Sequence, residues 1–165
     1  MKNKLPEKLN TVKLFLFDLE GVLIQQGSCN ENCFETIKHA CSEFNNSGLM
    51  FGIVTARTDD EFIKKLKTIE GCIVLSGSLD KVSATDNFLA AQAIDYQNVF
   101  YMGDDILDIQ LLKKCGVSCA PKSARREVKR VVTFLSQSES CEEFLKELIN
   151  YCGKSKETQI DATKY

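Results

Sequence analysis

The chain has 165 residues, of which 44% are hydrophobic and 27% are charged, and its formal net charge is −2 at pH 7. This length and composition predict one soluble globular domain with a substantial buried core. The slightly negative charge gives no reason to expect nucleic acid or an anionic membrane as a partner. No apolar run approaches the roughly 18–20 residues that span a bilayer, and the opening MKNKLPEKLN is too polar for a signal peptide, so we expect a cytoplasmic protein.

Eight cysteines raise the question of disulfides or a zinc site. Without a signal peptide the thiols meet a reducing compartment, and Cys72 and Cys119 lie in apolar runs where cysteine serves as a small hydrophobic residue. The Cys29/Cys33 and Cys115/Cys119 pairs lack the two-residue spacing of a zinc knuckle, and the chain has only one histidine. We therefore expect reduced thiols.

In chain order, apolar runs typical of strands alternate with segments of helical period. Strands are predicted at residues 12–17, 49–54, 72–75, 98–102 and 117–119, with a sixth candidate at 131–134. Helices are predicted at 33–44, 58–69, 86–93, 106–116 and about 140–151. The second of these helices begins with a Thr58/Glu61 capping-box pattern. The alternation predicts an α/β fold, a three-layer, Rossmann-like, doubly wound parallel sheet with helices on both faces.

The same pattern predicts a single domain over residues 1–152. Residues 153–165 contain only one large aliphatic side chain, so they cannot bury enough apolar surface to stay ordered. We expect this tail to be disordered, and the first several residues to fray.

Polar side chains follow the predicted strands at their carboxyl ends, which is where ligands bind in an open parallel sheet. They are Asp18 and Glu20 after the first strand, Thr55 after the second, Lys81 at the start of the helix after the third, and Asp104 and Asp105 after the fourth. Each residue alone has an ordinary explanation as a helix cap, a turn or a solvated charge. Their recurrence at successive strand ends predicts one shared site.

These segments resemble the motifs of the haloacid dehalogenase-like superfamily of aspartate-nucleophile phosphohydrolases. FLFDLEGVL is similar to the first motif, IVTAR to the second, Lys81 to the third and MGDDILD to the fourth, over about residues 13–122. Within the superfamily, the chain resembles the small capless phosphatases that act on 3-deoxy-manno-octulosonate 8-phosphate and the related domain of acylneuraminate cytidylyltransferases. The segment that follows their order and spacing is GSLDKVSATDNFLAAQAIDYQNVFYMGDDILDIQLLKKCGVSCAP.

The resemblance implies a metal-dependent nucleophile. Asp18 would attack phosphorus and form an aspartyl-phosphate. Mg²⁺ would be held by Asp18, the backbone carbonyl of Glu20 and Asp104, with Asp105 and Asp108 among or just behind the ligands. Mutual repulsion among these carboxylates is relieved only when the metal is bound, so metal binding is the physical reason for such a cluster.

The resemblance also implies how a phosphate would be held. Thr55, through its hydroxyl and the amides after it, would bind phosphoryl oxygens, and Lys81 would neutralise both the nucleophile and the phosphate. Arg57, two residues after Thr55, is well placed for substrate contact. The expected substrate is a small phosphorylated metabolite, such as a sugar or sugar-acid phosphate.

Glu20 is the first departure from the family pattern. Hydrolytic members usually carry an aspartate at this position, which protonates the leaving group and then activates water. The extra methylene of glutamate moves the carboxyl by roughly an ångström or more, and a misplacement of that size costs on the order of 100-fold in rate. Slow turnover, an altered phosphoryl acceptor and lost activity all stay open, and a Glu20→Asp change is expected to raise kcat.

The second departure concerns what covers the site. The resembled branch carries a β-hairpin after the first motif that builds a tetramer and partly roofs the active site, whereas here residues 24–44 lead almost directly into a helix. We therefore expect no tetramer, and leave another homo-oligomer open. No cap domain fits between the motifs, so we expect an open site. The alternative to an enzyme is a non-catalytic relative that binds a phosphorylated ligand or a protein partner such as a nucleotidyltransferase.

Overall fold

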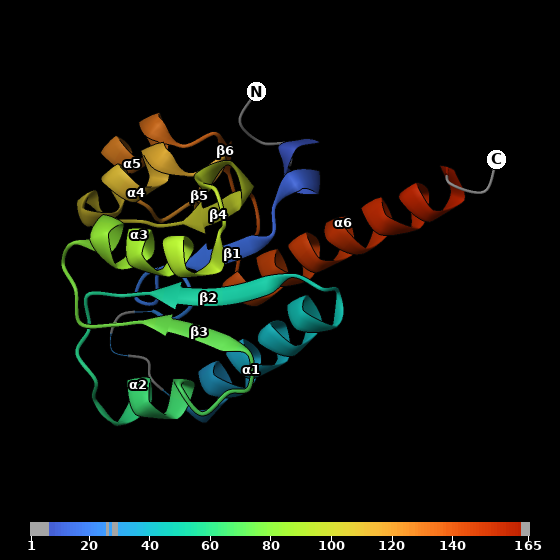
Figure 1. Cartoon of the computed structure of the whole chain (residues 1–165). Coiled ribbons are helices and arrows are strands. Elements are labelled where there is room, and N and C mark those ends of the chain that lie inside the picture. Colours follow the sequence, from blue (N-terminus) through green and yellow to red (C-terminus); the bar gives the residue numbers. More distant parts are fainter. Residues whose placement is uncertain (1–6, 26, 28–29, 163–165) are drawn as a thin grey trace.

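A six-stranded, wholly parallel sheet forms the centre of the molecule (Figure 1). The computed structural model describes residues 7–25, 27 and 30–162, with side chains described as far as residue 153. The strand order is β3-β2-β1-β4-β5-β6. The strands are Leu14–Phe17 (β1), Met50–Val54 (β2), Cys72–Leu75 (β3), Val99–Met102 (β4), Val117–Ala120 (β5) and Phe134–Leu135 (β6). The predicted doubly wound α/β fold is confirmed.

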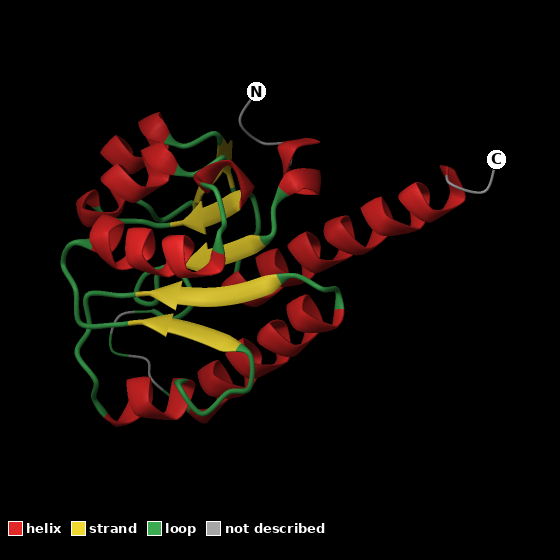
Figure 2. Cartoon of the chain, viewed as in Figure 1, coloured by secondary structure: helices red, strands yellow, loops and turns green. Residues whose placement is uncertain are grey.

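Helices cover both faces of this sheet (Figure 2). They are Glu31–Asn46 (α1), Glu61–Leu66 (α2), Lys81–Gln92 (α3), Ile109–Lys114 (α4), Arg126–Val131 (α5) and Cys141–Ala162 (α6), with short 3₁₀ turns at Glu7–Thr11 (η1), Tyr96–Asn98 (η2) and Ile106–Asp108 (η3). Helices α1, α2 and α6 share one core with the sheet, and α3, α4 and α5 share the other. Among the described residues, no helix is both long and apolar enough to cross a membrane.

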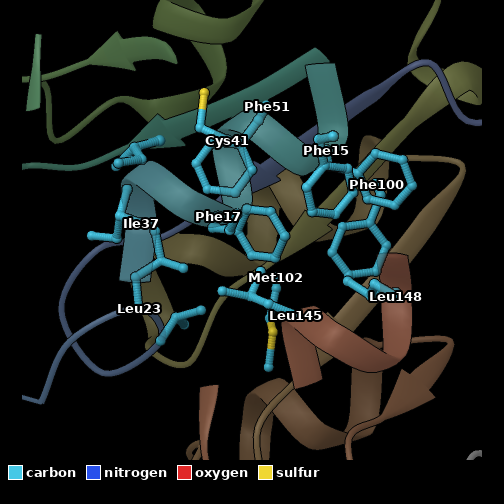
Figure 3. Close-up of a cluster of buried hydrophobic side chains, with 14 of the residues drawn as sticks. Phe15, Phe17, Leu23, Ile37, Cys41, Phe51, Phe100, Met102, Leu145 and Leu148 are labelled. Carbon is cyan, nitrogen blue, oxygen red and sulfur yellow. The ribbon is translucent and has the colours of Figure 1, made fainter. Parts of the chain in front are cut away.

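Strand β1 is buried on both faces, which explains its uninterrupted apolar sequence. Side chains alternate across a strand, so Phe15 and Phe17 face the α1/α6 core while Leu14 and Leu16 face the opposite core. The ring centroid of Phe15 lies 4.8 Å from that of Phe44 on α1. Figure 3 shows Phe15 and Phe17 among the buried hydrophobic side chains of this core. These contacts fix the strand whose carboxyl end carries Asp18.

Two local sequence predictions are wrong. The N-cap of α2 is Asp60, whose carboxylate accepts a hydrogen bond from the backbone N–H of Ile63 at 3.0 Å, so Thr58 does not open the helix. The sixth strand is Phe134–Leu135 rather than 131–134, because residues 126–131 form α5 and the chain leaves that helix at Val132. In both cases a capping or tertiary contact outweighs the local pattern.

The carboxyl-terminal helix extends beyond the predicted domain boundary. The backbone of α6 continues to Ala162, so residue 152 lies inside the helix, which projects from the body of the molecule (Figure 1). The predicted disorder of residues 153–165 stays a prediction, and residues 163–165 lie outside the described part.

The strand order places a switch point between β1 and β4. From β1 the chain winds outward through β2 and β3 and then returns to β4 on the other side of β1. Loops leaving the carboxyl ends of such a central pair diverge to opposite faces and open a crevice between them. The loops after β1, β2 and β4 therefore border the same region.

Candidate active site

Lys81, the first residue of α3, holds two aspartates together below the crevice. Its Nζ lies 2.8 Å from Asp18 Oδ1 and 2.6 Å from Asp108 Oδ1, and only 4% of the lysine side chain is exposed. Burial alone would lower the pKa of Lys81, but the two carboxylates outweigh it and raise that pKa above its usual value. The lysine therefore stays protonated, and its buried charge is paired.

Asp108 is saturated with hydrogen bonds. Its Oδ1 accepts from Lys81 and, at 2.5 Å, from the hydroxyl of Tyr101. Its Oδ2 accepts from the backbone N–H groups of Asp104 and Asp105, at 3.0 and 3.1 Å. A carboxylate offers about four lone-pair sites, so this set uses them all. Asp108 thus fixes the main chain of the loop after β4 and the position of the Lys81 ammonium.

Tyr101 is a site residue that the sequence analysis missed. It lies in β4 within the apolar run VFYM, which was interpreted only as a buried strand. Its hydroxyl is fully buried, and such a hydroxyl needs a polar partner. The signal that could have revealed this contact is a tyrosine at the end of a central strand that leads into an acidic loop.

Three carboxylates come close together with only the single positive charge of Lys81 among them. One oxygen from each of Asp18, Asp104 and Asp108 lies within 4.8 Å of the others. Burial, followed by the charge of Asp108, raises the pKa of Asp18 to about 7, although Lys81 works in the opposite direction. Burial and the neighbouring Asp108 and Asp105 raise the pKa of Asp104 to about 6. Additional positive charge would therefore stabilise this group at neutral pH.

The residues fit a hard divalent cation such as Mg²⁺. Asp104 Oδ1 is buried and has no hydrogen-bond partner among the described residues. A Cβ on Gly21, whose φ is +85°, would lie 2.1 Å from Asp104 Oδ2, so the main chain just after Glu20 runs directly against this carboxylate. Asp18, Asp104 and the neighbouring main chain offer the oxygen ligands that Mg²⁺ prefers.

Asp105 lies apart from this group. Its Oδ1 is 2.9 Å from Arg125 Nε and also accepts a hydrogen bond from the backbone N–H of Ile106 at 2.6 Å. The side chain therefore caps η3 and pairs with Arg125, while its neighbour Asp108 turns inward. The structure thus separates Asp105 from the other residues predicted to hold the metal.

Thr55 directly follows β2 and is almost completely buried. Its backbone N–H donates to the carbonyl of Leu75 at 2.9 Å, and its hydroxyl accepts from the backbone N–H of Arg57 at 3.1 Å. The first bond joins the residue after β2 to the end of β3, and the second closes a tight turn at the carboxyl end of β2, a strand adjacent to β1. The hydroxyl is fixed there by its own loop.

Arg57 and Glu20 form an ion pair between the loops after β2 and β1. The Arg57 Nη1 atom lies 3.1 Å from Glu20 Oε1, and Arg57 Nε lies 2.5 Å from Asp60 Oδ2. The Arg57 and Glu20 side chains are 25% and 42% exposed. The pair therefore lies at the surface, in contrast to the buried Lys81 group.

The cavity beside the loop after β1 has a volume of about 500 Å³. Hydroxyl groups from the loops after β5 and β6 contribute to its lining, as do Gly21 and Lys122. Asp18, Thr55 and Lys81 are not part of the lining, but Gly21, which lies against Asp104, is.

Together these features define an α/β protein with a lysine and clustered aspartates at the switch point of a parallel sheet. Residues 64–148, more than half of the chain, match the haloacid dehalogenase-like hydrolases. The chain belongs to this family, as its motifs suggested.

Solved structures show the same fold over nearly the whole chain. A 3-deoxy-D-manno-octulosonate 8-phosphate phosphatase from Moraxella catarrhalis, in complex with magnesium, phosphate and the sugar acid, is 19% identical with a TM-score of 0.76 and covers 96% of this chain and 97% of its own. The cobalt-bound enzyme from Haemophilus influenzae is 18% identical with a TM-score of 0.77, over 90% and 91%. A probable phosphatase from Pseudomonas syringae is 21% identical with a TM-score of 0.77, over 96% of both chains.

Proposed function

We propose that this protein is a Mg²⁺-dependent phosphatase that hydrolyses a phosphate monoester of a small metabolite, a sugar or sugar-acid phosphate. The observation that carries the proposal is the buried carboxylate of Asp18, in contact with Lys81 and close to the carboxylate of Asp104. One oxygen of Asp104 is buried and has no hydrogen-bond partner among the described residues. Membership of a hydrolase family supports the reaction type. The similar sugar-acid phosphatases support a polyhydroxylated leaving group, as do the serine hydroxyls among the residues that line the cavity beside Gly21.

Asp18 is the proposed nucleophile. One carboxylate oxygen forms a bond to phosphorus as the bond from phosphorus to the leaving oxygen breaks, which gives an aspartyl-phosphate. Water then attacks that phosphorus, releases inorganic phosphate and restores the carboxylate. Lys81 offsets negative charge during both steps, because its ammonium already contacts Asp18. Mg²⁺ held by Asp18, Asp104 and the main chain of Glu20 would supply further positive charge to the phosphoryl oxygens.

Thr55 and Glu20 have the remaining proposed roles. The buried hydroxyl of Thr55, at the end of the neighbouring strand, binds a phosphoryl oxygen. Glu20 gives a proton to the leaving alkoxide and later takes one from the attacking water. Its partly exposed position at the edge of the crevice suits a group that exchanges protons with solvent.

One observation favours the alternative, a non-catalytic binding module. The Glu20 carboxylate is engaged by Arg57. If this ion pair never opens toward a leaving group, the protein would still bind a phosphorylated ligand or a protein partner at the same crevice. A cytoplasmic location accompanies both proposals as a prediction. So does the expectation that the protein is not a tetramer, with another homo-oligomer left open.

A phosphatase screen tests the choice. Wild-type protein and Asp18→Asn are assayed with Mg²⁺, and again with excess chelator, on a panel of sugar and sugar-acid phosphates. The enzyme proposal expects metal-dependent release of phosphate by the wild type and none by the variant. Phosphate binding without turnover on the whole panel would instead support the binding module.

A further inference from the structure

We propose that Arg57 is a positioning residue for Glu20 and does not bind the substrate phosphate. The inference rests on the proposed phosphatase function. It identifies Arg57 as the residue that orients Glu20, the proposed acid–base group. Its basis is the ion pair that joins Arg57 Nη1 to Glu20 Oε1 at 3.1 Å across the loops after β2 and β1.

The Arg57 guanidinium is held in place from several directions. Its Nε lies 2.5 Å from Asp60 Oδ2, and its Cζ lies 5.7 Å from the centroid of the Phe62 ring. Asp60 is itself fixed, because its other carboxylate oxygen caps α2 through the backbone N–H of Ile63. An arginine whose planar fork is already oriented by a carboxylate and an aromatic ring presents its remaining N–H groups in a defined direction.

The main chain that carries Glu20 is equally constrained. The backbone N–H groups of Leu23 and Ile24 both donate to the carbonyl of Leu19 at 2.9 Å, and the N–H of Gly21 donates to the carbonyl of Ile24 at 2.7 Å. Gly21 also abuts Asp104, so this segment has little room to shift. The Glu20 carboxylate is therefore placed by its side-chain torsions and by Arg57, rather than by movement of its loop.

This geometry reverses the expected effect on kcat of the extra methylene in the Glu20 side chain. From sequence alone, the longer arm looked like a misplacement that Glu20→Asp should correct. In the structure, the length of glutamate is what lets the carboxylate reach a guanidinium held by Asp60 and Phe62. An aspartate on the same fixed main chain would be shorter by about one methylene and would lose the contact. Glu20→Asp is thus expected to lower kcat.

The charge balance around Arg57 argues against a phosphate-binding role. Its single positive charge already contacts two carboxylates, Glu20 and Asp60. A substrate phosphate competing for this group would have to displace one of them and would face the repulsion of the other. Lys81 also contacts two carboxylates, but one of them is Asp18, the proposed nucleophile, so its charge lies where the phosphoryl group would be transferred. The Arg57 contacts lie at Glu20 and Asp60 instead.

A double-mutant cycle in kcat and KM tests the proposal. Arg57→Ala is expected to lower kcat for a sugar phosphate about 10-fold or more, with little change in KM, because the acid–base group loses its orientation. In a Glu20→Gln background the same change should alter kcat by less than about twofold, because the positioned group is already gone. Arg57→Lys should recover part of the loss. Lys64→Ala, which breaks the exposed Lys64/Glu61 pair on α2, serves as the matched control.

A second substrate separates positioning from general damage to the structure. The p-nitrophenolate ion leaves without protonation, so formation of the aspartyl-phosphate from p-nitrophenyl phosphate should stay fast in Arg57→Ala while its hydrolysis slows. Rapid mixing should show a burst of p-nitrophenol close to one per chain, followed by slow turnover. A variant that is simply misfolded would slow both phases and show no burst.

Binding of inorganic phosphate in the presence of Mg²⁺ decides the question independently of turnover. The proposal expects the phosphate dissociation constant of Arg57→Ala to equal that of the wild type within about twofold. Three results would overturn the proposal. The first is a loss of about 10-fold or more in phosphate affinity, and the second is an equal loss of kcat from Arg57→Ala in the wild-type and Glu20→Gln backgrounds. The third is a gain in kcat for Glu20→Asp. A wild type without turnover on any substrate would instead defeat the proposed function, while the phosphate arm would still report on Arg57.

Discussion

Two charged groups link the β1 loop to the rest of the crevice, and they differ in depth. The Lys81 group is buried: Asp18, Asp108 and the Tyr101 hydroxyl surround an ammonium that is 4% exposed. The Arg57 group lies at the surface, where Glu20 and Asp60 flank a guanidinium that is 25% exposed. Both contain one cation and two carboxylates, so the contrast isolates the effect of burial.

Burial makes the ion pairs of the Lys81 group costly to break, whereas the more exposed ion pairs of the Arg57 group cost little to break. Removing one partner of a buried pair leaves an uncompensated charge and costs about 3–5 kcal/mol, whereas an exposed pair contributes about 0.2–1 kcal/mol. The proposed nucleophile Asp18 gains a fixed position from the first arrangement. The proposed proton carrier Glu20 gains a partner that it can leave without unfolding the protein.

The largest contrast is expected in turnover. Asp18→Asn should reduce phosphate release to the background rate, because an amide cannot form the acyl-phosphate bond. Its melting temperature in metal-free buffer at pH 8 should not fall below that of the wild type, because burial disfavours the ionised carboxylate there. Phosphate-release assays and thermal melts check both parts, and an Asp18→Asn protein with wild-type turnover would exclude this nucleophile.

A large difference in stability is expected between the buried and exposed cations. Lys81→Met leaves Asp18 and Asp108 buried without their cation and should reduce the free energy of unfolding by about 3–5 kcal/mol. Lys64→Met, in an exposed pair, should change it by less than about 1 kcal/mol. Urea denaturation of the two variants measures this difference, and similar losses would contradict the contrast.

A pH-dependent difference of intermediate size is expected from the raised pKa values. In the folded, metal-free protein the pKa of Asp18 is about 7 and that of Asp104 about 6, both above the ordinary value of 3.8. The folded state therefore binds more protons than the unfolded chain between about pH 4 and 7, and the free energy of unfolding should fall as the pH rises through this window.

Thermal melts with and without Mg²⁺ at pH 5 and pH 8 measure this effect. Mg²⁺ should stabilise the protein more at pH 8, because it favours the ionised carboxylates. Asp18→Asn should flatten the metal-free pH dependence, whereas Asp59→Asn, at an exposed carboxyl, should leave it in place. A metal effect that is equal at both pH values would place the cation elsewhere.

The smallest expected effect is that of Arg57 on stability. Arg57→Ala should lower the free energy of unfolding by about 1 kcal/mol or less, since its ion pairs are partly exposed. Urea denaturation alongside the kcat measurement would then show a variant that is nearly as stable as the wild type but catalytically impaired. A loss as large as that of Lys81→Met would remove the distinction between the two groups.

Sequence periodicity was sufficient to predict the sheet and the strand ends that carry Asp18, Thr55, Lys81 and Asp104. Burial on both faces produces apolar runs that are easy to recognise, and a polar residue just after such a run marks the carboxyl edge. The α/β alternation predicted a parallel sheet but no strand order, and the order β3-β2-β1-β4-β5-β6, which brings these ends together, was found only in the structure.

The remaining parts of the site depended on contacts that no local pattern encodes. In GDDILD, η3 turns Asp108 inward toward Lys81 and directs Asp105 to Arg125, a choice set by one turn of 3₁₀ helix. Tyr101 looked like any apolar strand residue until its hydroxyl met Asp108. The Arg57/Glu20 pair joins residues 37 positions apart in the sequence.

The central claim is that Asp18 carries the phosphoryl group during turnover, and a single-turnover trapping experiment tests it most directly. Glu20→Gln protein is mixed with Mg²⁺ and p-nitrophenyl phosphate labelled in the phosphoryl group, whose leaving group needs no proton from residue 20. The reaction is quenched in acid, the protein is digested, and the labelled peptide is identified by mass spectrometry. The account predicts label on the peptide that contains Asp18, and none when Asp18 is changed to Asn. Label on another residue, or an active wild type whose Asp18→Asn variant is labelled equally, would contradict it.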